Sequence, residues 1–453
     1  MPATAAAPPR LRQQLHFDAL VQRLRQRFAQ LPEPRRGPTF SRTDTLMAGL
    51  ALFTLKDPSL LAFTHRALDH NLHRVFGLQA LPSDTQMRCI LDDVDPVHLR
   101  PAFRDIFRLL QRSKLLQPFV FLHGCYLISL DGVEYFCSDK VHCDQCLTRQ
   151  RTNGETQYYH QLLGAALVHP DFPEVIPLAP EPIQRQDGQS KNDCERHAAR
   201  RWLKRFRREH PHLPVIVTED ALSSNAPHIR DLRDAHCHFL LGVKPGDHEA
   251  LFQQVYQRVL EEQGEEFQQR EASTGIQRRF LFVNDVRLNE ANQDVVVNFL
   301  RCVETDAQGQ EHEWTWVTDL NLTADEMVQG ARGGRARWRI ENETFNTLKN
   351  QGYHFEHNYG HGYKHLAVVF ALLMMLAFLI DQVQQKYNPV FRLAWDKKGS
   401  KKELWEAVRH LFSSFKVSSM QVIYEAIAYG YSRPQLEWLL ASALASPGGI
   451  DSS

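Results

Sequence analysis

The 453-residue sequence has no excess of either charge and no apolar run long enough to cross a membrane. Lys and Arg total 53, as do Asp and Glu, so net charge neither supports nor excludes a nucleic-acid partner. The longest uncharged apolar run, Leu366–Ile380, has fifteen residues. Because a bilayer span needs about 20 apolar residues, this run predicts a buried core helix instead.

Cysteine is scarce, and a secretion signal is missing. The N-terminus lacks the apolar core of a signal peptide, and the 453 residues include only eight cysteines. Without such a signal, this usage is typical of reduced thiols and not of a disulfide scaffold. We therefore expect a cytoplasmic protein.

The positive charge is concentrated in two segments. Residues 1–45 contain eight arginines against three acids, which gives 8 − 3 = +5, and the segment Arg196–Arg208 is also basic. Local positive patches on a neutral chain are suited to contact with a phosphate backbone. A solvated helix surface explains either patch alone equally well.

The hydrophobic pattern divides the chain into a helical first part and a mixed α/β remainder. The spacing predicts short helices within 1–118, and later helices at 193–210, capped by Asn192 or Asp193, and at 249–261. Strands are predicted at 126–130 and 133–136, joined by a turn at Asp131-Gly132, and at 162–168, 175–178, 215–218, 239–243, 278–304 and 313–319. A strand, helix, strand order implies parallel neighbours. Residues 382–402 are expected to be a polar link to a helical tail.

Three acids stand at positions where such a fold would bring side chains together. Asp131 and Asp220 follow predicted strands, and Glu341 starts a later helix. Arg337, Glu341, Phe345 and Lys349 follow one another at four-residue steps and therefore share one broad face of this helix. Ligands of open α/β sheets bind beyond the carboxyl ends of the strands. Three carboxylates there would hold hard cations, Mg²⁺ above all or Mn²⁺, and a pair of ions about 4 Å apart can drive phosphodiester cleavage.

These acids and the segments around them resemble a known family. Asp131, Asp220 and Glu341 are similar to the DDE triad of bacterial insertion-sequence transposases, which have an RNase H-like catalytic fold. The matching segments are LISLDG, VIVTEDALSSNAPHI, FLLGVKP, TWVTDLNL and RWRIENETFNTLKN. PSDTQMRCILD, KNDCER and HNYGHGYKHLAVVFALLMMLAFLIDQ further resemble an ISNCY-like branch. The resemblance runs from about residue 40 to 385 of this sequence.

The resemblance implies an activity and a domain order. Water, positioned by metal ions bound to the three acids, would attack the phosphodiester at each end of the insertion sequence. The released 3′-hydroxyl would then attack target DNA. The partners would be terminal inverted repeats, target DNA and a second copy of the chain, with the cytoplasmic protein nucleoid-associated when bound. The expected domains are a DNA-end-binding helical domain (1–118), the RNase H-like core in two parts (119–250 and 326–385), a β-rich insertion (251–325) and a C-terminal tail (386–453).

The motif around Glu341 departs from the broader signature Tyr-x2-Arg-x3-Glu-x6-Lys. Gly334 stands where Tyr is expected, and Lys349 falls one residue after the Lys position, which Leu348 occupies. The catalytic role of Glu341 is retained, with Glu343 as the alternative acid, whereas phosphate binding by Lys349 is less directly supported. Lys244 resembles a position near the DNA backbone, although a plain lysine at a strand end fits as well.

A second group of residues has the spacing of a structural zinc site. A single CxxC is only half of a zinc signature, and a loop with free thiols is the favoured interpretation. If zinc is bound, Cys143, Cys146 and His160 are the predicted ligands, with His142 or Cys137 as the fourth. The histidines His354, His357, His361 and His365 are interpreted as ordinary loop residues, because the Gly360–Gly362 turn breaks helical spacing. Trp338 is a candidate for stacking on a displaced base, or for core packing.

Two other functions stay open at this point. A catalytically silent DNA-binding remnant or domesticated regulator would retain the sequence without the activity. A DDE-type nuclease would cleave DNA with the same acids but would not join the cleaved ends to a target.

Overall fold

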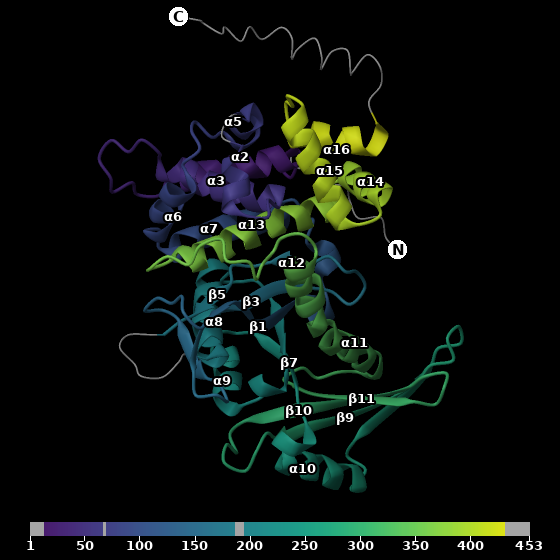
Figure 1. Cartoon of the computed structure of the whole chain (residues 1–453). Coiled ribbons are helices and arrows are strands. Elements are labelled where there is room, and N and C mark those ends of the chain that lie inside the picture. The colour runs from purple at the N-terminus through teal and green to yellow at the C-terminus, as the bar shows by residue number, and fades with distance from the viewer. Residues whose placement is uncertain (1–12, 67–68, 186–193, 431–453) are drawn as a thin grey trace, which may run out of the picture. The chain divides into compact units, whose positions relative to one another are not determined.

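The computed structural model describes residues 13–66, 69–185 and 194–430, which fall into two compact units (Figure 1). Unit 1 comprises the described residues within 1–115, 135–160 and 346–453, and unit 2 comprises those within 116–134 and 161–345. Each unit therefore combines stretches that are distant in the sequence. Asn192 and Asp193, suggested as helix caps, and Arg10 and Arg12 lie outside the described residues. The five sequence ranges given above stay a prediction.

Unit 1 is helical around one long apolar helix, α13 (Leu366–Tyr387), which is buried over almost its whole length. Ser, Asp and Asn side chains cap most of the other helices, so their free N–H groups are satisfied locally. These helices are α2 (Phe17–Phe28), α3 (Arg42–Leu55), α4 (Leu60–Thr64), α5 (His70–Phe76), α6 (Asp84–Asp92), α7 (Arg100–Arg112), α12 (Thr347–Asn350), α14 (Pro389–Lys398), α15 (Lys401–Ser414) and α16 (Met420–Tyr429).

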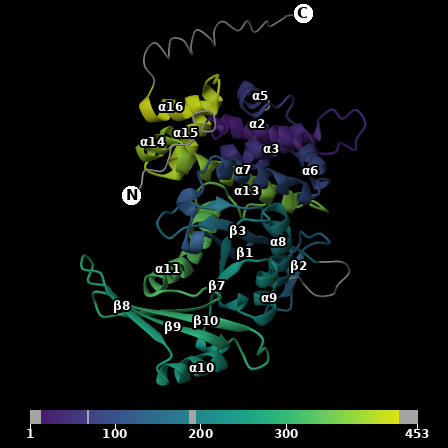
Figure 2. The ribbon, with the colours of Figure 1, turned by 180° about the vertical axis from the view of Figure 1, so that it is seen from behind.

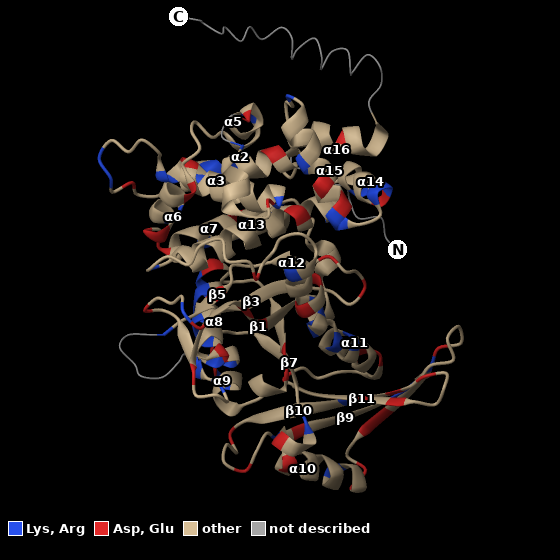
Figure 3. Cartoon of the chain, viewed as in Figure 1, with Lys and Arg blue, Asp and Glu red and all other residues tan. Residues whose placement is uncertain are grey.

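Helix α13 is long and apolar enough to cross a membrane by length and composition, but its most apolar part is entirely buried. Figure 3 shows its ribbon almost free of charged residues. The main charge on it is the buried Asp381, which pairs with Lys56 at 2.5 Å and accepts a hydrogen bond from the Tyr353 hydroxyl. The prediction of a buried core helix is therefore correct within the described part of unit 1.

The prediction of a polar link at 382–402 is wrong. Helix α13 continues to Tyr387, and Asn388 caps α14 directly after it. The glutamines that suggested a linker are buried and hydrogen-bonded: the Gln384 side chain donates to the Leu15 carbonyl at 2.8 Å and accepts from Asn388 at 3.0 Å. Paired amides remove the cost of burying polar groups, so the helix extends through them.

The main sheet of unit 2 has a parallel centre and an antiparallel extension. Its strand order is β3-β1-β6-β7-β11-β10-β9-β8, with β4 and β5 also pairing with β3. Strands β1, β6 and β7 are parallel neighbours, and β11 to β8 continue the sheet antiparallel (Figure 2). The strands are β1 (Tyr126–Ser138), β3 (Thr156–Val168), β4 (Ile176–Pro177), β5 (Glu181–Ile183), β6 (Val215–Glu219), β7 (His238–Gly242), β8 (Glu265–Arg270), β9 (Gln277–Arg287), β10 (Val296–Thr305) and β11 (Glu311–Thr318). In unit 1, β2 (Leu147–Gln150) pairs with the first residues of β3.

Helices of unit 2 connect and cover these strands. Helix α8 (Glu195–Glu209) packs on β5 and on α9 (Ala226–Asp234), α9 and α11 (Ala324–Arg335) both contact β7, and α10 (Glu249–Leu260) packs on β9 (Figures 1 and 2). After α11 the chain passes through a 3-10 turn and then a π-helix, Ile340–Asn346. Single π-turns are uncommon and occur most often at functional sites.

The predicted turn at Asp131-Gly132 does not exist. Both residues lie inside the continuous strand β1. Gly132 is needed for close approach and not for turning, since a Cβ added there would lie 2.0 Å from the Glu195 carboxylate. Glycine thus makes room for an acid from α8 beside the strand that carries Asp131.

Candidate active site

Two of the three predicted acids lie on or directly after neighbouring parallel strands of unit 2: Asp131 is inside β1, and Asp220 follows the last residue of β6. The β1–β6 register pairs Tyr126 with Val215 through Ser129 with Thr218, an offset of 215 − 126 = 89. Extended by two residues, this offset places Asp131 opposite Asp220, because 131 + 89 = 220. Adjacent strands are about 4.8 Å apart, so the two backbones approach closely. Asp220 follows β6 directly, and its carboxylate accepts the Leu222 N–H at 3.0 Å.

The third acid, Glu341, lies on the π-helix, which is fixed against the sheet by an aromatic ring. Phe345 packs over Gly164 of β3 so closely that a Cβ added there would lie 2.7 Å from the ring. The same Cβ would be 3.5 Å from the Asp131 carbonyl oxygen. The ring therefore needs a glycine beneath it, and it holds the helix of Glu341 beside the strand of Asp131.

The side chain of Arg337 contacts two of the three acids, Asp131 and Glu341. Its Nη1 lies 2.5 Å from Glu341 Oε1 and 3.4 Å from Asp131 Oδ2, and its carbonyl accepts the Ser129 hydroxyl at 3.1 Å. Burial, together with the negative charge of Glu341, raises the pKa of Asp131 to about 7, and Arg337 offsets only part of this rise. The cluster thus has more negative charge than its single arginine neutralises. A divalent cation with oxygen ligands would supply the missing positive charge.

A fourth carboxylate, Glu195, was missed from the sequence. It is the first residue of α8, its Oε1 accepts from the Gln161 amide at 2.7 Å, and it lies against Gly132. Desolvation and then the charge of Asp220 raise its pKa, so it stands within electrostatic range of that acid. The signal was present in the segment KNDCER, but an acid in the first helical turn is commonly explained by the helix dipole alone.

A groove of about 880 Å³ is lined by one of these acids, Asp220, and by Arg337, which contacts two others. Asp220, Lys244, Arg337 and Trp338 line it together with Trp314, Trp316 and Arg335. Lys244 is exposed after β7, and 43% of the Trp338 surface is accessible, so neither is used in the core. The groove combines cations and aromatic faces next to carboxylates, which are the components needed to hold a nucleic-acid strand at a metal site.

The departures from the signature have local explanations. A Cβ at Gly334 would lie 2.3 Å from the Trp316 indole, so this indole occupies the space that a tyrosine would need. A π-turn contains about one residue more than an α-turn, which equals the offset by which Lys349 follows the expected position. Lys349 itself belongs to unit 1, where it pairs with Glu356 at 2.7 Å. Glu343, the alternative acid, lies 3.8 Å from Arg339 and is not among the contacts of Asp131.

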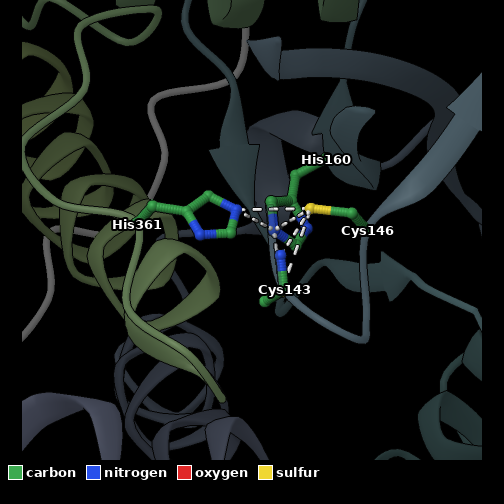
Figure 4. A group of neighbouring side chains, drawn as sticks. All are labelled: Cys143, Cys146, His160 and His361. Carbon is green, nitrogen blue, oxygen red and sulfur yellow. Dashed lines mark hydrogen bonds between the residues drawn. The ribbon is translucent and has the colours of Figure 1, made fainter. Parts of the chain in front are cut away.

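The predicted zinc ligands come together in unit 1, with one replacement. Cys143, Cys146 and His160 form a cluster whose fourth member is His361 (Figure 4). His142 points elsewhere and stacks on Tyr158 at 4.3 Å, and Cys137 is exposed and contacts Arg149. The interpretation of His361 as an ordinary loop residue is therefore wrong, because its imidazole is buried against the other three ligands.

The two basic segments are partly neutralised by ion pairs within the described residues. Arg25 and Arg27 pair with Asp44 and Asp105, and Arg35 pairs with Glu33. Three of the six arginines of α8 pair in the same way: Arg200 with Asp231, and Arg201 and Arg205 with Glu181. Much of the local positive charge is thus used inside the units. These patches give less support for phosphate binding than the sequence suggested.

The strand order and the parallel centre of the sheet, with acids beside it, fit an RNase H-like domain. Residues 150–379, just over half of the chain, match the family model of the transposase DDE domain. The chain belongs to this family. The comparison with curated proteins finds no similar chain.

Membership confirms the prediction of an insertion-sequence DDE transposase with a mixed α+β, RNase H-like fold. Transposase-type DNA cleavage is its general activity, and DNA is its substrate. The matched region contains Asp220 and Glu341 and begins after Asp131. The assignment to an ISNCY-like branch stays a prediction.

Proposed function

We propose that Asp131, Asp220 and Glu341 bind a pair of Mg²⁺ or Mn²⁺ ions and cut the DNA at the ends of the element. The observation that carries this proposal is the Arg337 guanidinium, which contacts both Asp131 and Glu341. The β1–β6 register, extended by two residues, also places Asp131 opposite Asp220. Oxygen ligands on adjacent elements suit hard divalent ions. Such ions would activate the attacking oxygen and stabilise the leaving one.

The side chains would divide the remaining tasks. Lys244 and Arg337 line the groove with Asp220 and would neutralise phosphates of the strand to be cut. Arg337 would also exchange its contact with Glu341 for a phosphate once a cation occupies the cluster, since the acids would then have another counter-charge. Trp338, exposed at the same groove, would stack on a base displaced next to the cleavage point.

Glu195 would act as a positioning residue. Its hydrogen bond to Gln161 fixes its carboxylate beside Gly132, and its charge acts on both Asp131 and Asp220. It would therefore raise the affinity of the cluster for a cation and orient the water around it. Its loss should impair cleavage less than loss of any of the three main acids.

The finer steps follow from this chemistry. The 3′-hydroxyl released by cleavage would attack target DNA by the same in-line displacement, and two element ends would be brought together by a dimer. The helices of residues 1–118 would recognise the terminal inverted repeats, and Lys349 would bind phosphate. We place the protein in the cytoplasm, on the nucleoid when bound.

The test is a supercoiled donor plasmid carrying the inverted repeats that flank the gene. Incubation with the full chain and Mg²⁺ should release fragments cut at the repeat ends, and a labelled target plasmid should acquire those ends. Cleavage without joining would identify a nuclease. DNA binding without cleavage would identify a silent remnant or regulator and refute the proposal.

A further inference from the structure

We infer that unit 1 contains a structural zinc site made by Cys143, Cys146, His160 and His361. This site is separate from the carboxylates of unit 2 and uses a different ligand chemistry. The cluster joins the segment between β1 and β3 to a histidine about 200 residues later in the chain. All four ligand atoms lie within 4.8 Å of one another (Figure 4).

The distances between ligand atoms fit a tetrahedron around zinc. With Zn–S of about 2.3 Å and Zn–N of about 2.05 Å, tetrahedral geometry requires about 3.8 Å between sulfurs, about 3.5 Å between sulfur and nitrogen, and about 3.3 Å between nitrogens. The Cys143–Cys146 Sγ distance is 3.9 Å. His160 Nε2 lies 3.6 and 3.4 Å from the two sulfurs, and His361 Nε2 lies 3.3 Å from Cys146 Sγ. The two Nε2 atoms are 3.1 Å apart. Five edges of the tetrahedron thus have the lengths that a zinc ion would impose.

Neighbouring groups orient the ligands for a metal. His361 Nδ1 lies 2.9 Å from the Gly362 carbonyl, which can only accept a hydrogen bond, so Nδ1 carries the proton and Nε2 presents its lone pair to the cluster. The Cys143 N–H donates to Cys146 Sγ at 3.4 Å. The ring of Tyr135 stacks on His160, and Phe136 packs against His361. Each imidazole is therefore held in one orientation.

The site has the closed character of a structural centre. Cys146, His160 and His361 are buried, and four protein ligands leave no coordination position for water or substrate. The two sulfurs are too far apart for a disulfide, which needs about 2.05 Å. A cation at the centre would bring the two thiols and the two imidazoles, three of the four residues being buried, into direct coordination.

The bound ion would order a segment with little regular structure of its own. Residues 351–365 lie between α12 and α13 and contain no helix or strand. Their far end is held by Asp92, whose carboxylate accepts the N–H groups of Tyr363, Lys364, His365 and Leu366. Zinc on His361 would fix the same segment two residues before these contacts. His361 follows Glu341 by 20 residues in the sequence, and the other three ligands come after β1, which carries Asp131.

The test measures metal in the full chain and does not depend on cleavage. Wild-type protein purified without chelator should contain about one zinc per chain by mass spectrometry, and Co²⁺ replacement should give the intense visible bands of a tetrahedral site with two thiolates. His361→Asn should lower zinc affinity by more than ~100-fold, since even outer partners of a ligand contribute 10–100-fold. His142→Asn is the matched control and should retain the metal.

The double variant Asp131→Asn, Glu341→Gln shows whether any zinc belongs to the carboxylates, and it should contain as much zinc as wild type. A metal-free wild-type chain that takes up no Co²⁺ would overturn the inference. Loss of zinc in His142→Asn with retention in His361→Asn would overturn the ligand assignment. Both measurements on wild type stay informative if a variant fails to fold.

Discussion

The two units of this transposase-family chain each contain a cluster suited to a metal, and the clusters differ in every respect that decides what a metal does. The carboxylates of unit 2 are hard oxygen ligands beside a groove, with 47% of the Glu341 side chain exposed. The Cys–His cluster of unit 1 uses sulfur and nitrogen and is buried. As proposed, the first site would exchange its ions and admit DNA, whereas the second would retain its ion.

The difference extends to stability. In unit 2, Asp131 and Glu341 repel each other, and Arg337 neutralises only part of the charge, so the cluster costs stability until a cation binds. In unit 1, the ligands already lie at the distances that the ion requires, so binding adds directly to folding free energy. Substitutions should therefore have opposite consequences in the two clusters.

The largest expected effect is on cleavage. Asp131→Asn, Asp220→Asn or Glu341→Gln should reduce Mg²⁺-dependent cutting of the donor plasmid by at least ~10³-fold, because each removes a metal ligand, while DNA binding in a gel-shift assay remains. Glu343→Gln is the matched control and should cut normally, since Glu343 faces Arg339. Normal cutting by any of the three variants would show that the substituted acid is not a catalytic metal ligand.

The second effect separates the clusters by stability. Cys146→Ser or His361→Asn should lower the free energy of unfolding by several kcal/mol, because the metal contributes to folding. Asp131→Asn should leave it unchanged or raise it in Mg²⁺-free buffer, because one of two repelling carboxylates is removed. Urea unfolding of the zinc-loaded proteins measures both. Equal destabilisation in the two clusters would contradict the contrast.

A smaller effect concerns the groove. Trp338→Ala should weaken binding of single-stranded element ends by about 5- to 100-fold, the range expected for loss of one stacked base. Tyr363→Ala, an exposed aromatic residue of unit 1, provides the comparison and should bind like wild type. Fluorescence anisotropy with labelled oligonucleotides gives both affinities. Unchanged binding would assign Trp338 to packing alone.

The smallest effect is expected at the fourth acid. Glu195→Gln should slow cleavage by about 10-fold and raise the Mg²⁺ concentration needed for half-maximal rate, because Glu195 acts on the cluster without being one of its three main ligands. Glu209→Gln at the other end of α8 should leave both values unchanged. A lower rate without any shift in Mg²⁺ dependence would indicate a structural role only.

How far the sequence predicted each cluster depends on how local its contacts are. Arg337 and Glu341 are four residues apart, and helical spacing was enough to pair them. His361 joins ligands more than 200 residues away, and nothing in its own neighbourhood indicates this. Gly132 was read as a turn because glycine usually permits one, yet here it makes room for Glu195. Local chemistry was predictable, whereas contacts created by the tertiary fold were not.

The central claim, that one chain holds exchangeable ions on carboxylates and a fixed ion on Cys and His, has one direct test. Crystals of the full chain grown with Mn²⁺ should be measured at the manganese and zinc absorption edges. The account predicts manganese between Asp131, Asp220 and Glu341 and zinc between Cys143, Cys146, His160 and His361. Manganese bound elsewhere with those carboxylates empty, or zinc absent from the Cys–His cluster, would contradict it.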